Sequence, residues 1–137
     1  MKLYFGHPVN AYNTELEKEL IRIISEKLPG WEIENPNQPH HDEGYQVWKA
    51  RTGNGMDYYT LEVLPSCHGG IFLPFRDGAW GAGVYTEGKF YAERGLPVFE
   101  ISPMGAISSP DFKLVIELSV PGTRARIRDT AGNVIPY

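Results

Sequence analysis

The sequence predicts an α/β fold in which helices cover both faces of an open, twisted and mostly parallel sheet of five strands. Three observations predict it. Short apolar runs that end at Gly, Pro or Asn recur along the chain, as buried strands do. Longer segments place apolar residues three and four positions apart, which is the pattern of amphipathic helices. The chain opens with strand, helix and strand, the unit from which parallel sheets are built.

The first strand and the first helix have clear boundaries. Residues 3–5 form an apolar run that ends at a Gly-His-Pro turn. A helix follows from Thr14, which forms a capping box with Glu17, and Pro29-Gly30 ends it. Its buried face consists of apolar residues three and four apart: Leu16, Leu20, Ile23, Ile24 and Leu28.

The next part of the chain is predicted as strand, loop and helix. Residues 31–34 alternate in polarity and predict a second strand. Residues 35–55 are rich in Pro and Gly and predict a loop, with at most a brief helix at residues 45–51. Residues 56–64 predict a helix in which Leu61 and Leu64 share one face.

Three further strands are predicted at residues 70–73, 97–101 and 112–118. A glycine-rich stretch at residues 77–83 leads into a helix over residues 82–94, which Gly95 ends. Residues 123–128 are compatible with either a short helix or a strand.

Composition and charge narrow the class of protein. The 137 residues are 42% hydrophobic, and with no linker between segments they predict one domain, residues 1–137, of flavodoxin-like or Rossmann-like type. The net charge of −4 disfavours a nucleic acid polymer as partner. No apolar run nears the roughly 20 residues that span a bilayer, and the N-terminus lacks a signal-peptide stretch. We therefore expect a soluble, cytoplasmic protein that binds neither membrane nor nucleic acid polymer.

A candidate site lies in the segment from Asp77 to Gly88, between the third strand and its helix. In open α/β sheets ligands bind at the carboxyl ends of strands, where such loops lie. Its glycines let backbone approach a ligand, although many such connections simply need small residues. Glu87 lies on an otherwise apolar helix face. A buried, unpaired carboxylate is costly, so Glu87 is either functional or an edge residue with an ordinary partner.

Two more acids and several aromatic residues are candidates. Asp57 begins a helix and Asp77 follows a strand, and each is also an ordinary residue at such a place. With Glu87 they would supply the two carboxyl groups that chemistry at a sugar requires. Trp80 lies among glycines, so we expect it to be half exposed and to stack on a planar ligand. The tyrosines of the region serve either that purpose or the core: Tyr58, Tyr59 and Tyr85.

The sequence predicts neither a metal centre nor a cofactor. His40-His41 and the two acids after them have a metal-ligand composition, but adjacent residues rarely point at one ion, and zinc-motif spacings are absent. Cys67, the one cysteine, is expected to be a small buried residue rather than a nucleophile served by His68. A phosphate-binding loop, a dinucleotide-binding glycine motif and a Ser-centred elbow are absent as well.

The residues around Tyr4 and Glu87 resemble the nucleoside 2-deoxyribosyltransferase family, which includes related deoxynucleoside and deoxynucleotide N-hydrolases, over residues 1–101. In that family a Tyr on the first strand precedes a Gly-x-Pro turn, as Tyr4 does here. The segment from Gly83 to Gly88 is similar to the family's nucleophile motif, and the segment from Asp77 to Gly81 is similar to its glycine-rich, acid-containing loop. Asp57 lies on the helix before the third strand, where the family carries an Asp.

The resemblance implies cleavage or transfer at the N-glycosidic bond of a deoxynucleoside. Glu87 would be the nucleophile, ionised near a helix N-terminus, and the Tyr4 hydroxyl would lie within hydrogen-bond reach and orient it. Asp57 or Asp77 would hold the sugar hydroxyls or protonate the base. The implied substrate-binding residues are Gly6, His7, Asp77, Trp80, Gly81 and Gly83.

Several alternatives stay open. The sugar acceptor, a base or water, distinguishes a transferase from a hydrolase. The first loop carries no Lys or Arg to grip a 5′-phosphate, which slightly favours a nucleoside over its monophosphate. The other class is a non-catalytic nucleotide-binding or sensing module, because fold does not determine function. The resemblance and the many aromatic residues predict a homodimer or larger homo-oligomer, with its contact at residues 36–55 and the helix from Met56.

Overall fold

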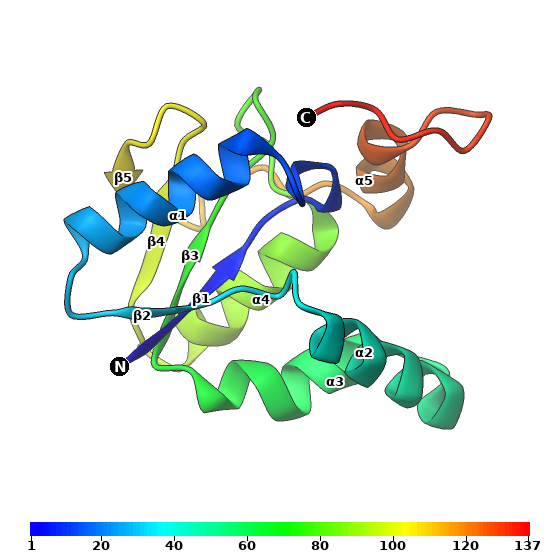
Figure 1. The fold of residues 1–137 in the computed structure, drawn as a ribbon, viewed down its shortest axis with the longest axis horizontal. Coiled ribbons are helices and arrows are strands. Elements are labelled where there is room, and N and C mark those ends of the chain that lie inside the picture. The colour runs from blue at the N-terminus through cyan, green and yellow to red at the C-terminus, as the bar shows by residue number, and fades with distance from the viewer.

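A five-stranded open sheet forms the centre of the computed structural model, which describes residues 1–137 (Figure 1). The strands are β1 (Lys2–Gly6), β2 (Glu32–Glu34), β3 (Gly69–Phe72), β4 (Val98–Ile101) and β5 (Ile107–Ser108). Their order is β2-β1-β3-β4-β5, and all pairings are parallel except that of β4 with β5. This is the strand order of flavodoxin-like sheets. The predicted open, mostly parallel α/β sheet is confirmed.

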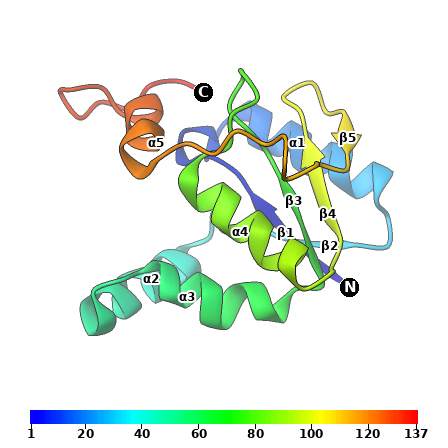
Figure 2. The same cartoon turned by 180° about the vertical axis from the view of Figure 1, so that it is seen from behind.

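Helices cover both faces of the sheet, as predicted. The helices of the chain are α1 (Glu15–Lys27), α2 (Pro39–Thr52), α3 (Met56–Tyr58), α4 (Ala82–Glu93) and α5 (Val120–Ile127). α1 lies in front of the sheet in Figure 1, and α4 lies in front of it in Figure 2, which shows the opposite side. α2 and α3 lie side by side at one end of the molecule in both views. None of the helices combines the length and the apolar character of a membrane span.

Alternating residues of the strands build two cores. Leu3 and Phe5 of β1 pack with α1 on one face of the sheet. Tyr4 packs with the residues of α4 on the other. Side chains along a strand point alternately to its two faces, so Tyr4 lies on the side of the sheet that α4, with Glu87, covers.

The first helix begins as predicted. Thr14 is its N-cap, and the Thr14 hydroxyl oxygen accepts a hydrogen bond from the Glu17 N–H at 3.2 Å. The Glu17 side chain turns back to accept the N–H of Asn13, at 3.2 Å. Leu20 and Ile24 are fully buried against the sheet, which confirms the predicted face.

The predicted loop at residues 35–55 is wrong, because most of it forms α2. Pro39 occupies the first turn of the helix, and Gly53, at φ 79°, ends it in the left-handed conformation. Periodicity did not reveal the helix because His41 is its one buried residue. Gly44 allows α2 to approach the next helical segment closely, since a Cβ atom there would lie 2.3 Å from the Tyr58 ring.

The helix predicted over residues 56–64 is present, but its register changes. α3 continues into a π-helical turn over Tyr59–Val63 and a 3₁₀ turn over Leu64–Ser66. A π-helical turn inserts extra backbone and rotates the residues that follow it. Leu64 is therefore buried while Leu61 is 61% exposed, and the expectation that they share a face is wrong.

The strand predicted over residues 112–118 is also wrong. The fifth strand is Ile107–Ser108, which pairs antiparallel with β4, whereas residues 112–118 form one isolated bridge, Glu117 to Trp80. The apolar pattern misled because Leu114 and Ile116 are 79% and 65% exposed and join no core. The undecided residues 123–128 belong to α5, except for its C-cap.

Candidate functional site

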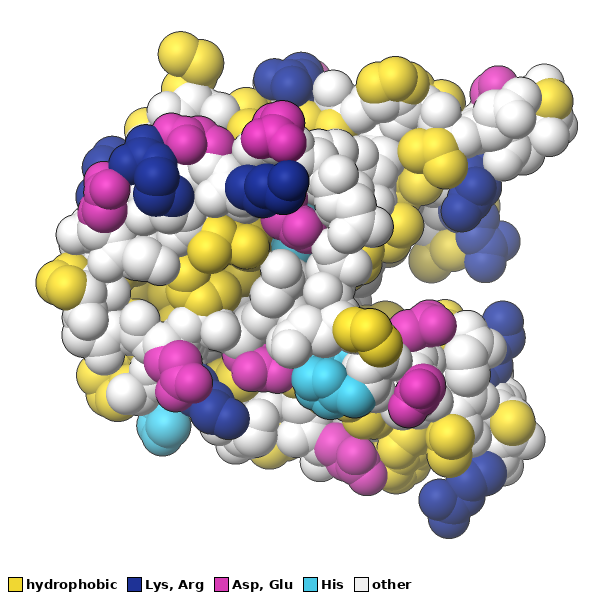
Figure 3. All heavy atoms as spheres, viewed as in Figure 1, with side chains coloured by type: hydrophobic (Ala, Val, Ile, Leu, Met, Phe, Trp, Pro, Cys, Tyr) yellow, Lys and Arg dark blue, Asp and Glu magenta, His cyan; other side chains and the backbone are white.

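A cavity of about 1050 Å³ opens at the carboxyl ends of β1, β2 and β3. Its walls come from the loop after β1, the start of α2, the start of α3, the first turns of α4 and the end of α5. Figure 3 shows the surface hollowed between the side of α5 and the side of α2 and α3. The strand order reverses between β1 and β3, where ligands of open α/β sheets bind. The cavity has the size of a small-molecule site.

Glu87 and Tyr4 meet in this cavity. Glu87 comes from the second turn of α4 and is 7% exposed, and Tyr4 comes from β1 and is 1% exposed. The Tyr4 hydroxyl donates a short hydrogen bond to Glu87 Oε2, so the contact that we expected is present. Gly6 makes room for the pair, because a Cβ atom there would lie 3.1 Å from Glu87 Oε1 and 2.5 Å from the Phe72 ring.

Burial controls the proton on Glu87. It raises the pKa of this carboxyl from 4.5 to about 8, and the hydrogen bond from Tyr4, which favours the ionised form, offsets only part of the effect. Burial therefore opposes the ionised form that we expected of Glu87 near the helix N-terminus. Burial and the neighbouring Glu87 raise the pKa of Tyr4 well above 10, so the phenol stays protonated and donates.

Two further tyrosines face the same carboxyl group. Tyr12 follows β1, and Tyr59 lies on the π-helical turn, a feature frequent at functional sites. Burial and then Glu87 raise the pKa of both phenols. Both hydroxyls therefore remain neutral hydrogen-bond donors beside Glu87, inside the cavity.

His7 lines the cavity but is fully engaged by the protein. Its Nδ1 lies 2.9 Å from the Phe5 carbonyl oxygen and its Nε2 lies 2.7 Å from Glu17 Oε2. Although burial acts to raise the pKa of Glu17, hydrogen bonds from His7 and Asn37 lower it below its usual value. Both ring nitrogens thus face oxygen atoms of the protein. His7 has no N–H left over for a substrate phosphate.

Of Asp42, Asp57 and Asp77, only Asp42 lines the cavity. Asp57 accepts a hydrogen bond from Asn54 at 3.3 Å and does not line the cavity. Asp77 also lies outside it, largely exposed, and its ion pair with Arg126 at 2.7 Å lowers its pKa. The expectation that both lie with Glu87 at one site is wrong. Asp42, from α2, lines the cavity instead.

Trp80 is not a stacking wall. Its side chain is fully buried, packs on Phe72 with ring centroids 5.6 Å apart, and donates Nε1–H to Glu100 Oε1 at 2.9 Å. The expectation of a half-exposed Trp80 is wrong, because the segment after Trp80 turns into α4 and encloses the ring: a Cβ atom at Gly88 would lie 2.8 Å from it.

Gly81 and Gly83 lie where the glycine-rich loop was expected to meet a ligand. Both line the cavity at the start of α4. Gly81 is the N-cap of α4, and the next N–H, of Ala82, is bound by Thr123 Oγ1 of α5 at 2.9 Å. This contact joins α5 to the wall of the cavity.

The sequence analysis missed Tyr12 and Asp42 as cavity residues, and it left Tyr59 open between ligand stacking and the core. Tyr12 carried a usable signal, because it lies in the loop directly after the first strand, where ligands bind. Asp42 carried none, since the helix that presents it was predicted as a loop.

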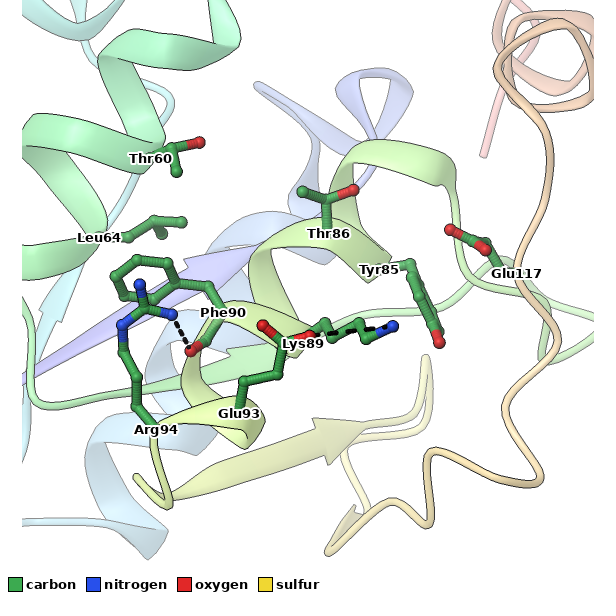
Figure 4. A pocket seen from close by; sticks show the side chains of 9 residues that line it. All are labelled: Thr60, Leu64, Tyr85, Thr86, Lys89, Phe90, Glu93, Arg94 and Glu117. Carbon is green, nitrogen blue, oxygen red and sulfur yellow. Dashed lines mark hydrogen bonds and ion pairs between the residues drawn. The ribbon is translucent and has the colours of Figure 1, made fainter.

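A second, smaller cavity of about 400 Å³ lies on the outer side of α4 (Figure 4). It contains neither Glu87 nor Tyr4, and three of its charged residues interact with neighbours on α4 or at its C-cap. Lys89 lies 3.9 Å from Glu93, and the Arg94 guanidinium lies 3.5 Å from the centre of the Phe90 ring. This surface has no buried titratable group, so the candidate site is the larger cavity.

Comparison with known proteins adds no family to this description. No protein-family model, no curated protein and no solved structure matches the chain. Its class is therefore defined by fold and site alone. It is an open α/β domain with a buried, tyrosine-bonded carboxyl group in a cavity at the carboxyl edge of the sheet.

Proposed function

We propose that this chain is a cytoplasmic enzyme that cleaves, or transfers the sugar of, a 2-deoxynucleoside at its N-glycosidic bond. One observation carries the proposal: the Glu87 carboxyl group is held by Tyr4 inside a cavity of small-molecule size. The resemblance of these two segments to nucleoside 2-deoxyribosyltransferases supports it. The occupied ring nitrogens of His7 favour a nucleoside over its 5′-monophosphate.

The reaction follows from Glu87 as a nucleophile. A carboxylate oxygen of ionised Glu87 bonds to the anomeric carbon of the sugar, and the C–N bond breaks with its electron pair going to the base. The base takes up a proton from solvent and leaves. A second base or water then bonds to the same carbon and gives up its proton to solvent, while the bond from that carbon to Glu87 breaks and its electron pair returns to the carboxylate. Tyr4 holds the carboxylate in place and stays protonated throughout.

Neutral donors surround the position of the departing base. Tyr12 and Tyr59 line the cavity as protonated phenols, so they donate hydrogen bonds to nitrogen atoms that gain electrons. Asp42 is the other carboxylate of the cavity and accepts hydrogen bonds from N–H or O–H groups of the substrate.

The direct test is release of base. Purified protein is incubated with a panel of 2-deoxynucleosides and their 5′-monophosphates, with and without a second base, and the products are separated by chromatography. We expect free base from at least one deoxynucleoside, and a new nucleoside when the acceptor base is present if the enzyme is a transferase. If no base is released from any compound of the panel, the proposed enzymatic activity is wrong.

Turnover is expected to rise with pH and to reach half of its maximum near the Glu87 pKa of about 8, since only the ionised carboxylate attacks. The negative charge of Glu87 contributes to the raised pKa of four phenols: Tyr4, Tyr12, Tyr59 and Tyr91. The ionisable groups other than phenols that line the cavity are Asp42, Arg128 and His7, and His7 is hydrogen-bonded to Glu17. The measurement is kcat/KM against pH.

Tyr4→Phe is the matched variant for this profile. It removes the hydrogen bond that favours the ionised carboxylate, so the rise should move to higher pH, by up to about one pKa unit. A profile that falls with pH, or one that Tyr4→Phe moves to lower pH, contradicts the assignment.

Asp42→Asn is expected to lower kcat/KM by about 10-fold to 100-fold, because it removes a charged hydrogen-bond acceptor from the cavity. Asp57→Asn and Asp77→Asn are the matched controls, since neither residue lines the cavity. Both should stay within about twofold of wild type. Steady-state kinetics on all three variants tests this, and a larger loss in Asp57→Asn or Asp77→Asn than in Asp42→Asn would reverse the assignment.

A non-catalytic nucleotide-binding or sensing module is the second candidate. The specific observation in its favour is the raised pKa of Glu87. At neutral pH most of this carboxyl is protonated, and a protonated carboxyl donates a hydrogen bond to a ligand but does not attack it. Calorimetric binding of a deoxynucleoside that the protein leaves intact would support this candidate.

The proposal includes a homodimer in contact through α2 and α3. These elements project from the sheet (Figure 1). Val47 on α2 and Leu61 on the π-helical turn that follows α3 are more than half exposed. The many aromatic residues support a dimer less than we expected, because Trp80 is buried in the core and not at the surface. Light scattering should give a mass of about twice the 15.4 kDa of one chain. The Leu61→Glu variant should have the mass of one chain. A mass of one chain that dilution does not change contradicts the dimer.

A further inference from the structure

Glu34, His40 and His41 gather beside the cavity wall, apart from the Glu87 pair. One ligand atom of each lies within 4.8 Å of the others. Glu34 ends β2, and the two histidines lie in the first turn of α2. We propose that these three side chains bind a divalent transition-metal ion of the Zn²⁺ type.

His41 is oriented as a metal-binding histidine is. It is 4% exposed, its Nδ1 lies 2.7 Å from the Tyr58 hydroxyl, and its Nε2 lies 2.6 Å from Glu34 Oε1. In metal sites the ring nitrogen that does not bind the ion is typically held by a hydrogen bond, which fixes the ring. Tyr58 supplies that bond here. The ion would lie between His41 Nε2 and Glu34 Oε1, in place of the hydrogen bond that now joins them.

His40 supplies the third ligand. Its ring centroid lies 4.0 Å from that of His41, with an angle of 39° between the ring planes. The expectation that adjacent histidines do not converge is therefore wrong, because the first turn of α2 brings both rings to the end of β2. His40 is exposed, so it moves onto the ion without disturbing the core and leaves a coordination position for water.

The donor set and the charge around it suit Zn²⁺. Two imidazoles and a carboxylate form a donor set found in zinc sites. Residues 31–48 contain four acidic residues and no Lys or Arg. This excess of negative charge opposes the partial positive charge of the α2 N-terminus.

A bound ion would fasten β2 to α2, the helix that carries Asp42 to the cavity. The site does not depend on the proposed reaction, because none of its three ligands lines the cavity with Glu87. Its test therefore needs no activity measurement.

The experiment titrates the full chain, stripped of metal with a chelator and freed of any histidine tag, with Zn²⁺ in a calorimeter. Co²⁺ serves as a spectroscopic probe. We expect one saturating ion per chain, a rise in the melting temperature, and a visible Co²⁺ spectrum of nitrogen and oxygen ligation. His40→Ala and Glu34→Gln should each weaken binding by about tenfold or more.

Variants of Cys67 and His68, two other adjacent residues with metal-binding side chains, are the controls. His68→Ala and Cys67→Ser should leave binding unchanged, because neither residue belongs to the cluster of Glu34, His40 and His41. His40→Ala keeps the His41–Glu34 bond, so loss of binding in it is not a consequence of unfolding. No saturable binding, binding unaffected by His40→Ala, or a sulfur-to-cobalt band that Cys67→Ser removes would each overturn the proposal.

Discussion

Glu87→Gln is expected to abolish turnover, by at least about 10⁴-fold, in a protein that remains folded. The amide has the shape of the carboxyl group, and its oxygen still accepts the hydrogen bond from Tyr4. It lacks the carboxylate charge that attacks the sugar. Substrate binding should persist, because the cavity walls are unchanged. Base release and calorimetric binding, measured on the same variant, separate the two effects.

The same variant should also resist heat better than wild type, and increasingly so as pH rises. The folded protein holds the Glu87 proton up to a pKa of about 8, against an ordinary value of 4.5. The stabilisation that this proton gives to the folded protein is therefore full below pH 4.5 and is lost as pH rises through about 8. Gln has no proton to lose. We expect little difference in melting temperature near pH 4.5 and a gain of several degrees above pH 8.

Glu93→Gln is the matched control on the same helix. Glu93 is exposed and pairs with Lys89 at 3.9 Å, so its replacement should change neither turnover nor the pH dependence of melting. If Glu87→Gln retains turnover, Glu87 is not the nucleophile. A melting temperature of Glu87→Gln that falls relative to wild type as pH rises contradicts the buried proton.

Trp80→Ala is expected to destabilise the protein by about 3–5 kcal/mol, the usual cost of emptying a large buried site. The indole is fully buried between Phe72 and Phe112. Its loss also leaves Glu100 without the Nε1–H donor. Against a typical total stability of about 5–15 kcal/mol, this is a large fraction. Urea denaturation followed by circular dichroism measures it.

Trp80→Phe and Trp48→Ala are the comparisons for this result. Trp80→Phe keeps much of the packing and should cost less than Trp80→Ala. Trp48 is only half-buried, so its truncation should also cost less. If Trp80→Ala were as stable as wild type and bound ligand more weakly, the residue would be a stacking wall after all.

The site shows how far residue patterns reach. The Tyr4–Glu87 contact was predictable, because both residues occupy positions that parallel strand–helix units bring to one edge of a sheet. The choice among aspartates was not, because Asp42 reaches the cavity only through α2, whose weak periodicity predicted a loop. The protonation of Glu87 was also misjudged, since it depends on how completely the fold excludes water from the carboxyl group.

The fold shows the same division. The β1–α1–β2 opening, the caps of α1 and the glycine that ends α4 follow from residues close in sequence, because periodicity, capping and turn formation are local. The sequence by itself thus determined the α/β class, the mostly parallel sheet and the candidate pair at its edge.

Only the tertiary structure decided which strand closes the sheet, where Trp80 lies and which acid faces Glu87. Each depends on contacts between segments far apart in the chain. Residues 112–118 have the composition of a strand but find one backbone partner, at Trp80, whereas the two-residue β5 pairs with β4. An apolar run therefore does not determine which strand it pairs with, or whether it is buried at all. The partner is chosen by packing over the whole molecule, which no window of sequence contains.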